Sequence, residues 1–242
     1  MLRREYPTQN PLRRVRAAGV RTAGDLIGWT HGKARDMATI GPTSRRARPF
    51  GTFGFGAAIC APLDTLVNPQ AIHLGAGTLI ASHAVLSAGW IPDQVDLPER
   101  VIVIGERCLI GRGSSIVAHR SIVIGDDVWT GHHVHITDMN HGYEDPDIPI
   151  SQQWMTESPV SIGSGSWLGH GAIVLPGAQI GRHCVVGANS VVTGDIPDHS
   201  VAVGAPARVI RRVGPGDHPH LRGGSAASTA AGTAADTATV TN

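Results

Sequence analysis

Aliphatic residues recur at every sixth position along much of the chain. The clearest run lies near the C-terminus, and its members are Ile162, Leu168, Val174, Ile180, Val186 and Val192. Glycine follows four of these six residues, and small residues stand four places after most of them. A period of six is neither helical nor that of a simple alternating strand. It predicts short strands joined by bends, three to a coil, whose aliphatic side chains form one continuous apolar column.

The same periodicity continues upstream in three further triplets. Their inward residues are Leu74, Ile80 and Leu86; Ile104, Ile110 and Ile116; and Ile124, Thr130 and Ile136. The whole pattern predicts about five coils. It is interrupted at about residues 87–103, 119–122 and 138–161. Insertions in a solenoid leave the column as surface loops, often on the binding side, so the long third interruption is the first place to look for a site.

The remaining segments define the organisation of the chain. Residues 1–70 are a basic N-terminal arm and lead-in, within which 11–38 predict one or two short helices and 41–70 predict irregular strands. Residues 71–213 form the β-helix, closed by an extended segment that folds back over the last coil. Residues 214–242 are rich in Gly, Ala, Ser and Thr and are expected to be disordered.

Composition and charge limit the classes of partner that the protein is expected to bind. The formal net charge of +1 on 242 residues gives no overall field for nucleic acid or an anionic membrane. Eleven Lys and Arg fall within the first 50 residues, and we interpret them as a solvated arm in preference to a polyanion-binding segment. Cys108 and Cys184 occupy inward positions and are expected to fill the core. Reduced cysteines, no signal peptide and no apolar stretch of membrane-spanning length favour a cytoplasmic protein.

Three features together resemble the hexapeptide-repeat acyltransferases, in particular the maltose/galactoside O-acetyltransferase and polysaccharide-biosynthesis branch. They are the repeats, the loop WTGHHVHITDMNHGYEDPDIPI and the ending VVTGDIPDHSVAVGAPARVI, and they cover about residues 70–213. The resemblance implies an all-β, left-handed parallel β-helix that forms a homotrimer, with acetyl-CoA bound between subunits. It also implies a CoA-dependent O-acyltransferase that acetylates a hydroxyl of a sugar or sugar-containing acceptor, with no metal expected.

The resemblance assigns the general base to His141, which opens the long loop. A sugar hydroxyl is a poor nucleophile at neutral pH, and a neutral imidazole that removes its proton typically contributes about 10²–10⁴-fold. The other ring nitrogen needs a partner that holds the tautomer. Asp138 and Glu144 are candidates for that partner, as is a backbone carbonyl. His119 stands where relatives carry polar residues around the acceptor, and we expect it to be an outward-facing residue.

The resemblance also places the acyl donor. Trp167 matches an aromatic residue beside the thioester arm of CoA, and Trp129 holds the equivalent corner one coil earlier, where the two indoles could stack. Gly194 stands where relatives often have lysine. The other positions carried over are Gly169, His170 and Ala188 along the pantetheine, Thr193 near the adenine, and Arg208 and Arg211 near the phosphates.

Two other functions stay open on the same fold. The histidines in or beside the coils permit a zinc-dependent hydratase of the γ-class carbonic anhydrase kind, which needs three converging imidazoles. His133 and His119 occupy equivalent places but on different triplets, and this disfavours the metal site. A non-catalytic scaffold is the other alternative. The sequence does not determine the acceptor, the length of the acyl group, or whether an oxygen or a nitrogen receives it.

Overall fold

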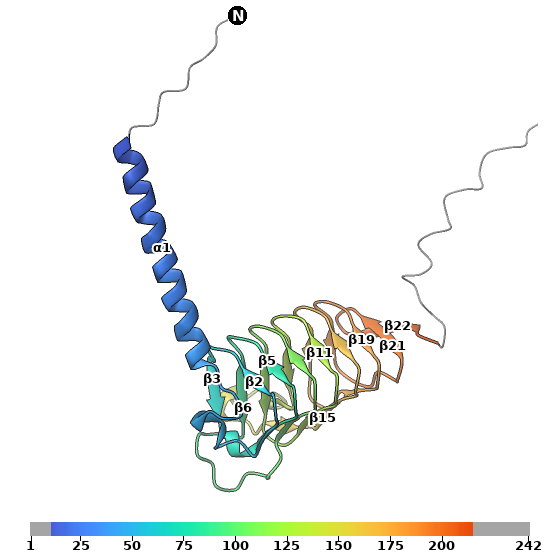
Figure 1. The fold of residues 1–242 in the computed structure, drawn as a ribbon. Coiled ribbons are helices and arrows are strands. Elements are labelled where there is room, and N and C mark those ends of the chain that lie inside the picture. Colours follow the sequence, from blue (N-terminus) through green and yellow to red (C-terminus); the bar gives the residue numbers. More distant parts are fainter. Residues whose placement is uncertain (1–10, 215–242) are drawn as a thin grey trace, which may run out of the picture. The chain divides into compact units, whose positions relative to one another are not determined.

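The computed structural model describes residues 11–214. The first element is a single helix of 28 residues, α1 (Pro11–Ala38), in place of the one or two short helices expected. A short 3₁₀ turn, Arg45–Ala47, follows it. A second 3₁₀ turn, Pro69–Ala71, precedes the first predicted coil. From Thr52 onward nearly all the regular elements are strands of two to five residues, and Figure 1 shows them stacked as successive coils.

Three parallel sheets form the walls of the coils. The first sheet contains β1 (Thr52–Phe53), β4 (Ile72–Leu74), β7 (Ile102–Ile104), β10 (Ile122–Ile124), β15 (Val160–Ile162) and β18 (Gln179–Ile180). The second contains β2 (Ala58–Ile59), β5 (Leu79–Ile80), β8 (Leu109–Ile110), β11 (Trp129–Thr130), β16 (Trp167–Leu168) and β19 (Val185–Val186), extended by β21 and β22. The third contains β3 (Thr65–Val67), β6 (Val85–Ala88), β9 (Ser115–Ala118), β12 (His135–Thr137), β17 (Ile173–Val174) and β20 (Val191–Val192).

Each strand pairs with its equivalent in the neighbouring coil. Ile122, for example, pairs with Ile102 on one side and Val160 on the other. Because the chain visits the three sheets in turn, the strands wind as a parallel β-helix, and this confirms the all-β class. The arrangement fits the left-handed β-helix that the resemblance implies.

The strands form six complete triplets, one more than the approximate five expected. The additional triplet, β1 to β3, lies within the segment 41–70 that we expected to be irregular. Its inward residues Phe53, Ile59 and Leu66 are spaced by six and then seven positions. The extra residue breaks the periodicity, and the sequence pattern therefore conceals this coil.

The predicted apolar column is present. All its predicted aliphatic members are at most 2% exposed, and Thr130 is also buried. Cys108 and Cys184 are buried in the same column as expected, and burial raises the pKa of both thiols. One uninterrupted apolar core therefore runs through the coils and fixes the corners where the loops leave.

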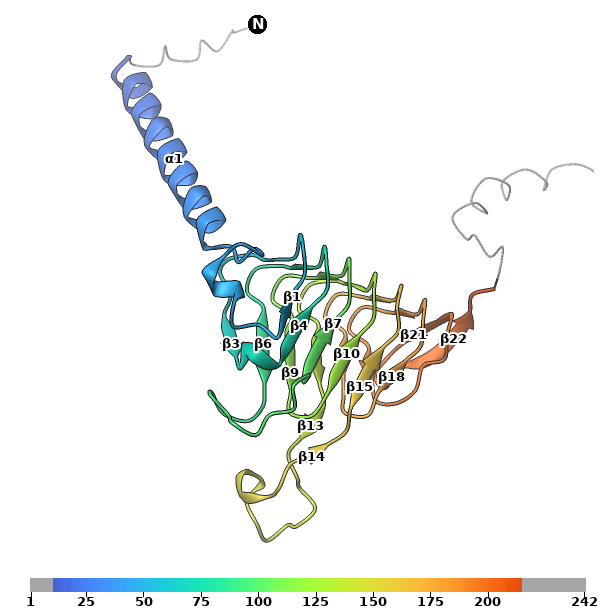
Figure 2. The ribbon, with the colours of Figure 1, turned by 60° about the horizontal axis from the view of Figure 1, so that its bottom comes forward.

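The long interruption is a structured insertion. Its base is a two-stranded antiparallel ribbon of β13 (Met139–Asn140) and β14 (Thr156–Glu157). A 3₁₀ turn, Ile150–Gln152, lies within the insertion. Figure 2 shows the insertion extending away from the coils beyond β13 and β14.

The C-terminal end folds back as expected. β21 (Ser200–Val203) pairs in parallel with β19, and β22 (Arg208–Arg212) returns antiparallel to β21. The expected disordered tail falls, apart from Gly214, outside the described residues. Within residues 11–214, no helix has the length and apolar character needed to cross a membrane.

One half-buried histidine is expected to make the stability of this fold depend on pH. Burial lowers the pKa of His135 in β12 below the usual value of about 6.5. The unfolded chain therefore binds a proton here more readily, and His135 should lower the free energy of unfolding as pH falls through that value. Urea titrations at pH 7.5 and 5.5 should show His135→Gln losing less stability on acidification than the native chain. Equal losses would exclude this role.

Candidate functional site

Asp138 forms the base of the long insertion. Its side chain is fully buried. One carboxylate oxygen accepts a hydrogen bond from the backbone N–H of His119 at 2.8 Å, and the other accepts from Arg120 at 2.8 Å and Ser121 at 2.7 Å. Both oxygens thus accept hydrogen bonds from the backbone of residues 119–121, in the short interruption of the repeat. Within the described residues no hydrogen bond joins this carboxylate to the His141 ring, and its three hydrogen bonds instead connect the insertion to the preceding coil.

His119 lies beside this joint and is buried, in contrast to the outward position expected. Its ring packs on Trp90, with centroids 4.3 Å apart and planes inclined by 32°. Its Nδ1 is 3.4 Å from Oε1 of Glu157 but has no hydrogen-bond partner of good geometry. The loop that follows β6 brings Trp90 across the ring. Neither Trp90 nor Glu157 carries a periodic signal in the sequence, so this contact was not foreseen.

His141 follows β13 directly and its side chain is exposed. The described part of the chain places no hydrogen-bond partner on its ring. The Glu144 carboxylate instead accepts the backbone N–H of Tyr143 at 2.9 Å. The adjacent Gly142 is buried, and a Cβ there would overlap the Trp154 carbonyl oxygen, so the backbone beside His141 tolerates little change. The insertion thus holds an accessible imidazole on a closely packed backbone.

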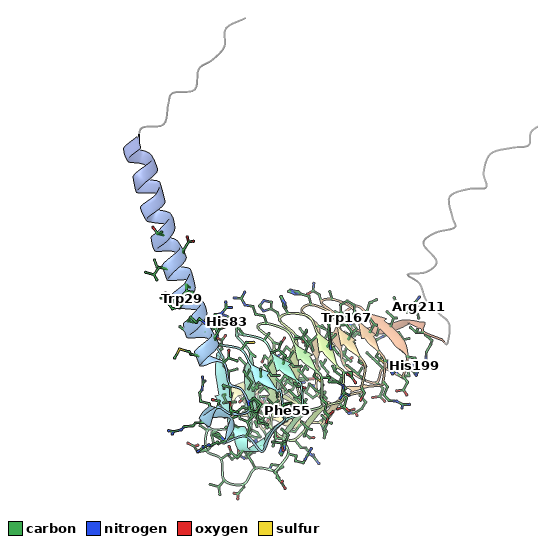
Figure 3. All side chains as sticks on the ribbon, viewed as in Figure 1. Trp29, Phe55, His83, Trp167, His199 and Arg211 are labelled. Atoms are coloured by element: carbon green, nitrogen blue, oxygen red, sulfur yellow. The ribbon has the colours of Figure 1, made fainter. Side chains whose placement is uncertain are left out.

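Trp129 and Trp167 stand in register on neighbouring coils. Their strands β11 and β16 turn both side chains outward, and these are 56% and 51% exposed. The predicted one-coil spacing is confirmed, but the described residues show no ring contact between the two indoles. Figure 3 places Trp167 on the outer surface of the coils. Two half-exposed indoles on one face offer an apolar surface to a ligand or a second chain.

The predicted pantetheine residues meet at the corner between the second and third sheets. Gly169 approaches the next coil so closely that a Cβ there would lie 2.5 Å from the Ala188 nitrogen. The His170 carbonyl accepts the Asn189 N–H at 2.8 Å. Gly169, His170 and Ala188 thus form one continuous edge.

Two of the residues expected at the adenine and phosphate end, Thr193 and Arg208, come together. Thr193, Gly194 and Arg208 line a cavity of about 270 Å³. The same strand β22 carries Arg211, paired with Val201. Figure 3 places Arg211 near the C-terminal end of the described chain. The cavity has one arginine that can meet a phosphate, with glycine at the position where relatives often have lysine.

The predicted base and the predicted donor residues lie at different corners of one chain. The His141 insertion leaves between β12 of the third sheet and β15 of the first. The Gly169–Ala188 edge lies between the second and third sheets. The structure therefore groups the predicted donor residues with one another but does not bring His141 to them within a single chain.

Three histidine side chains gather at the corner between the second and third sheets. The rings of His132, His133 and His170 approach one another with centroid distances of 5.5 to 6.5 Å. Among the residues with described side chains, no group of three His, Cys, Asp or Glu is arranged to hold a metal ion. The zinc alternative therefore gains no support from this corner.

Comparisons with known proteins agree with the repeat. Residues 159–194 match the family of the bacterial transferase hexapeptide (six repeats). Residues 101–129 match the hexapeptide repeat of succinyl-transferase.

Two curated relatives are similar to part of this chain. A probable acetyltransferase of Mycobacterium tuberculosis is 43% identical over 107 residues, which are 44% of this chain and 36% of that protein. WbbJ of Escherichia coli, which carries the name of a lipopolysaccharide biosynthesis O-acetyl transferase, is 42% identical over 104 residues, 40% of this chain and 53% of WbbJ. The chain thus spans between about a third and a half of the length of these relatives.

A solved structure shares the fold. AntD, an N-acyltransferase from Bacillus cereus in complex with dTDP and 3-hydroxybutyryl-CoA, superposes with a TM-score of 0.59 at 21% identity. The superposition covers 69% of this chain and 85% of that one. The family models and the curated relatives thus show that parts of this chain are similar to hexapeptide-repeat transferases and to acetyltransferases.

Proposed function

We propose that this protein is a CoA-dependent O-acyltransferase that moves an acetyl group from acetyl-CoA to a hydroxyl of a sugar or sugar-containing acceptor. The names of the two curated relatives, both 42% identical or more, support acetyl transfer, and that of WbbJ supports an oxygen acceptor. The grouping of Trp167, Gly169, His170 and Ala188 on one face and edge supports a donor groove.

The observation that carries the proposal is the separation of His141 from this groove. The insertion and the groove occupy different corners, so a second copy must supply one of them to complete the site. A trimer whose threefold axis runs parallel to the axis of the β-helix would place the insertion of one subunit against the groove of its neighbour. The unpartnered His141 ring is in keeping with an orienting partner from another subunit. The expected cytoplasmic location stays a prediction.

The proposed reaction needs no covalent enzyme intermediate. His141 takes the proton from the acceptor hydroxyl as that oxygen attacks the thioester carbonyl. The new O–C bond forms, the C–S bond breaks, and the proton passes from the imidazolium to the departing CoA sulfur. A donor for the developing oxyanion is required, and a backbone N–H at the corner of Gly169 is in a suitable element to supply it.

The donor assignment predicts a specific loss of affinity. Arg208→Gln should weaken CoA binding about tenfold, because one charge-assisted hydrogen bond to a phosphate is lost. Calorimetric titration with CoA measures the effect. Arg48→Gln is the matched control, since Arg48 is exposed near the opposite end of the described chain. Equal affinities for the two variants would remove Arg208 from the site.

The direct test of the function is transfer itself. Purified protein is mixed with acetyl-CoA and a panel of sugars, and the release of free thiol is followed together with acetylated product. Light scattering gives the oligomeric state in the same buffer. Turnover by a trimer supports the proposal. Absence of CoA binding, or full activity in a monomer, would refute it.

A further inference from the structure

A second cavity of about 580 Å³ lies at the N-terminal end of the coils and shares no lining residue with the groove described above. Four residues from the last turns of α1 form one wall: His31, Ala34, Arg35 and Ala38. Their spacing of three and four positions puts them on one face of the helix. The volume is within the usual range for small-molecule sites. Figure 3 shows His83 close to the end of α1, where this cavity lies.

The opposite wall comes from the first coils. It is formed by Ala61, Pro62, Ser82, His83 and Arg112. Ser82 and Arg112 stand at equivalent corners of successive coils, because Gly113 N–H donates to the Ser82 carbonyl at 3.0 Å. His133 N–H donates to Arg112 in the same way at 2.9 Å. The coils thus fix the spacing of these side chains independently of the helix.

The ionisable groups that line the cavity are all basic: Arg35, Arg112, His31 and His83. Among the described residues, one carboxylate has a hydrogen bond or ion pair with this set. Asp64 Oδ1 lies 3.0 Å from Nδ1 of His83 and orients that ring, which leaves Nε2 without a partner in the described chain. Two guanidinium groups and an oriented imidazole supply more donors and charge than one carboxylate ligand uses. They match the three oxygens and near-dianionic charge of a phosphoryl group.

Apart from Ser82, the rest of the lining is apolar. Three alanines and Pro62 lie among the basic groups. An inorganic ion would leave these apolar surfaces exposed to water, whereas an organic group attached to the phosphoryl group would bury them. We propose that this cavity binds a small organic phosphomonoester, with its phosphoryl group between Arg35 and Arg112. This site does not depend on the acyl-transfer function.

The relation to CoA has to be tested, because CoA also carries a phosphomonoester. Arg112, His132 and His170 occupy the same corner on successive coils, joined by hydrogen bonds from His133 N–H to Arg112 and from Gly171 N–H to His132. Two coil steps separate Arg112 from His170, or roughly 10 Å. The cavity and the expected pantetheine edge are therefore neighbours on one edge but do not share residues.

Titration calorimetry on the full chain tests the proposal with phenyl phosphate, inorganic phosphate and phenol. Phenyl phosphate should bind more tightly than inorganic phosphate, and phenol should give no heat. Arg35→Gln and Arg112→Gln should each weaken phenyl phosphate about tenfold, the loss of one charge-assisted bond. Arg100→Gln, an exposed loop residue, is the control. Far-UV circular dichroism and thermal unfolding establish that all three variants fold.

Three results would overturn the proposal: equal affinity of phenyl phosphate for all variants, equal binding of phenol, or displacement of phenyl phosphate by saturating CoA. The last result would assign the basic lining to the donor groove. Retention of phenyl phosphate in the presence of CoA, with loss in both cavity variants, supports a separate site. Because the measurement needs no turnover, it holds whether or not acyl transfer is observed.

Discussion

Replacement of His141 by alanine is expected to lower kcat for acetyl transfer by about 10²–10⁴-fold, with the Kd for CoA unchanged. The imidazole is exposed at the end of β13, and its proposed task is to remove a proton in the transition state. A group that acts only there affects kcat and not ground-state binding of the donor. Steady-state kinetics and calorimetry on the same preparation measure the two quantities.

The control for His141 is His199→Asn. His199 is also exposed, but it lies near the C-terminal end of the coils, where its ring stacks on His183. Asparagine suits its backbone φ of 58°. The control should keep native activity. Normal turnover by His141→Ala would refute the assigned base, whereas a parallel loss of CoA affinity would indicate a disturbed groove.

Asp138→Ala should cause the largest loss of stability, about 3 kcal/mol in the free energy of unfolding. The carboxylate is fully buried and accepts three backbone N–H groups at 2.7 to 2.8 Å. Alanine leaves these donors buried without an acceptor, and each hydrogen bond to a charged group contributes roughly 1.5–3 kcal/mol. Local rearrangement of residues 119–121 and of the insertion should recover part of this lost stability. Urea denaturation measures the difference.

Asp138→Asn keeps one acceptor oxygen and should lose less than the alanine variant. Asp96→Ala serves as the surface control, because Asp96 is exposed in the loop after β6. Native stability in Asp138→Ala would mean that the three N–H groups find other acceptors. If the variant folds, its insertion should also become more sensitive to protease, since Asp138 joins it to the preceding coil.

The repeat allowed most of the coils to be predicted from the sequence. A buried aliphatic residue at every sixth position determines which side chains enter the column, and this rule holds for every predicted member. The one-coil spacing of Trp129 and Trp167 followed from the same periodicity. It failed at β1 to β3, where one extra residue between Ile59 and Leu66 breaks the pattern.

The candidate site was less predictable. The motif located the insertion and the residues of the predicted donor edge, whose proximity depends on equivalent positions in successive coils. It did not locate the partners of Asp138, because these are backbone N–H groups of another segment. The burial of His119 depends on Trp90, which reaches it from a loop outside the repeat.

The sequence by itself determined the coil, its column and the order of the loops, because a six-residue period is a local property that any stretch of chain displays. Only the tertiary structure decided which loop residues meet. The three hydrogen bonds to Asp138, the His119–Trp90 contact and the basic cavity beside α1 each join segments from different interruptions or from outside the repeat. Such segments do not follow the six-residue repeat. Their contacts therefore depend on how the loops pack against the folded coils.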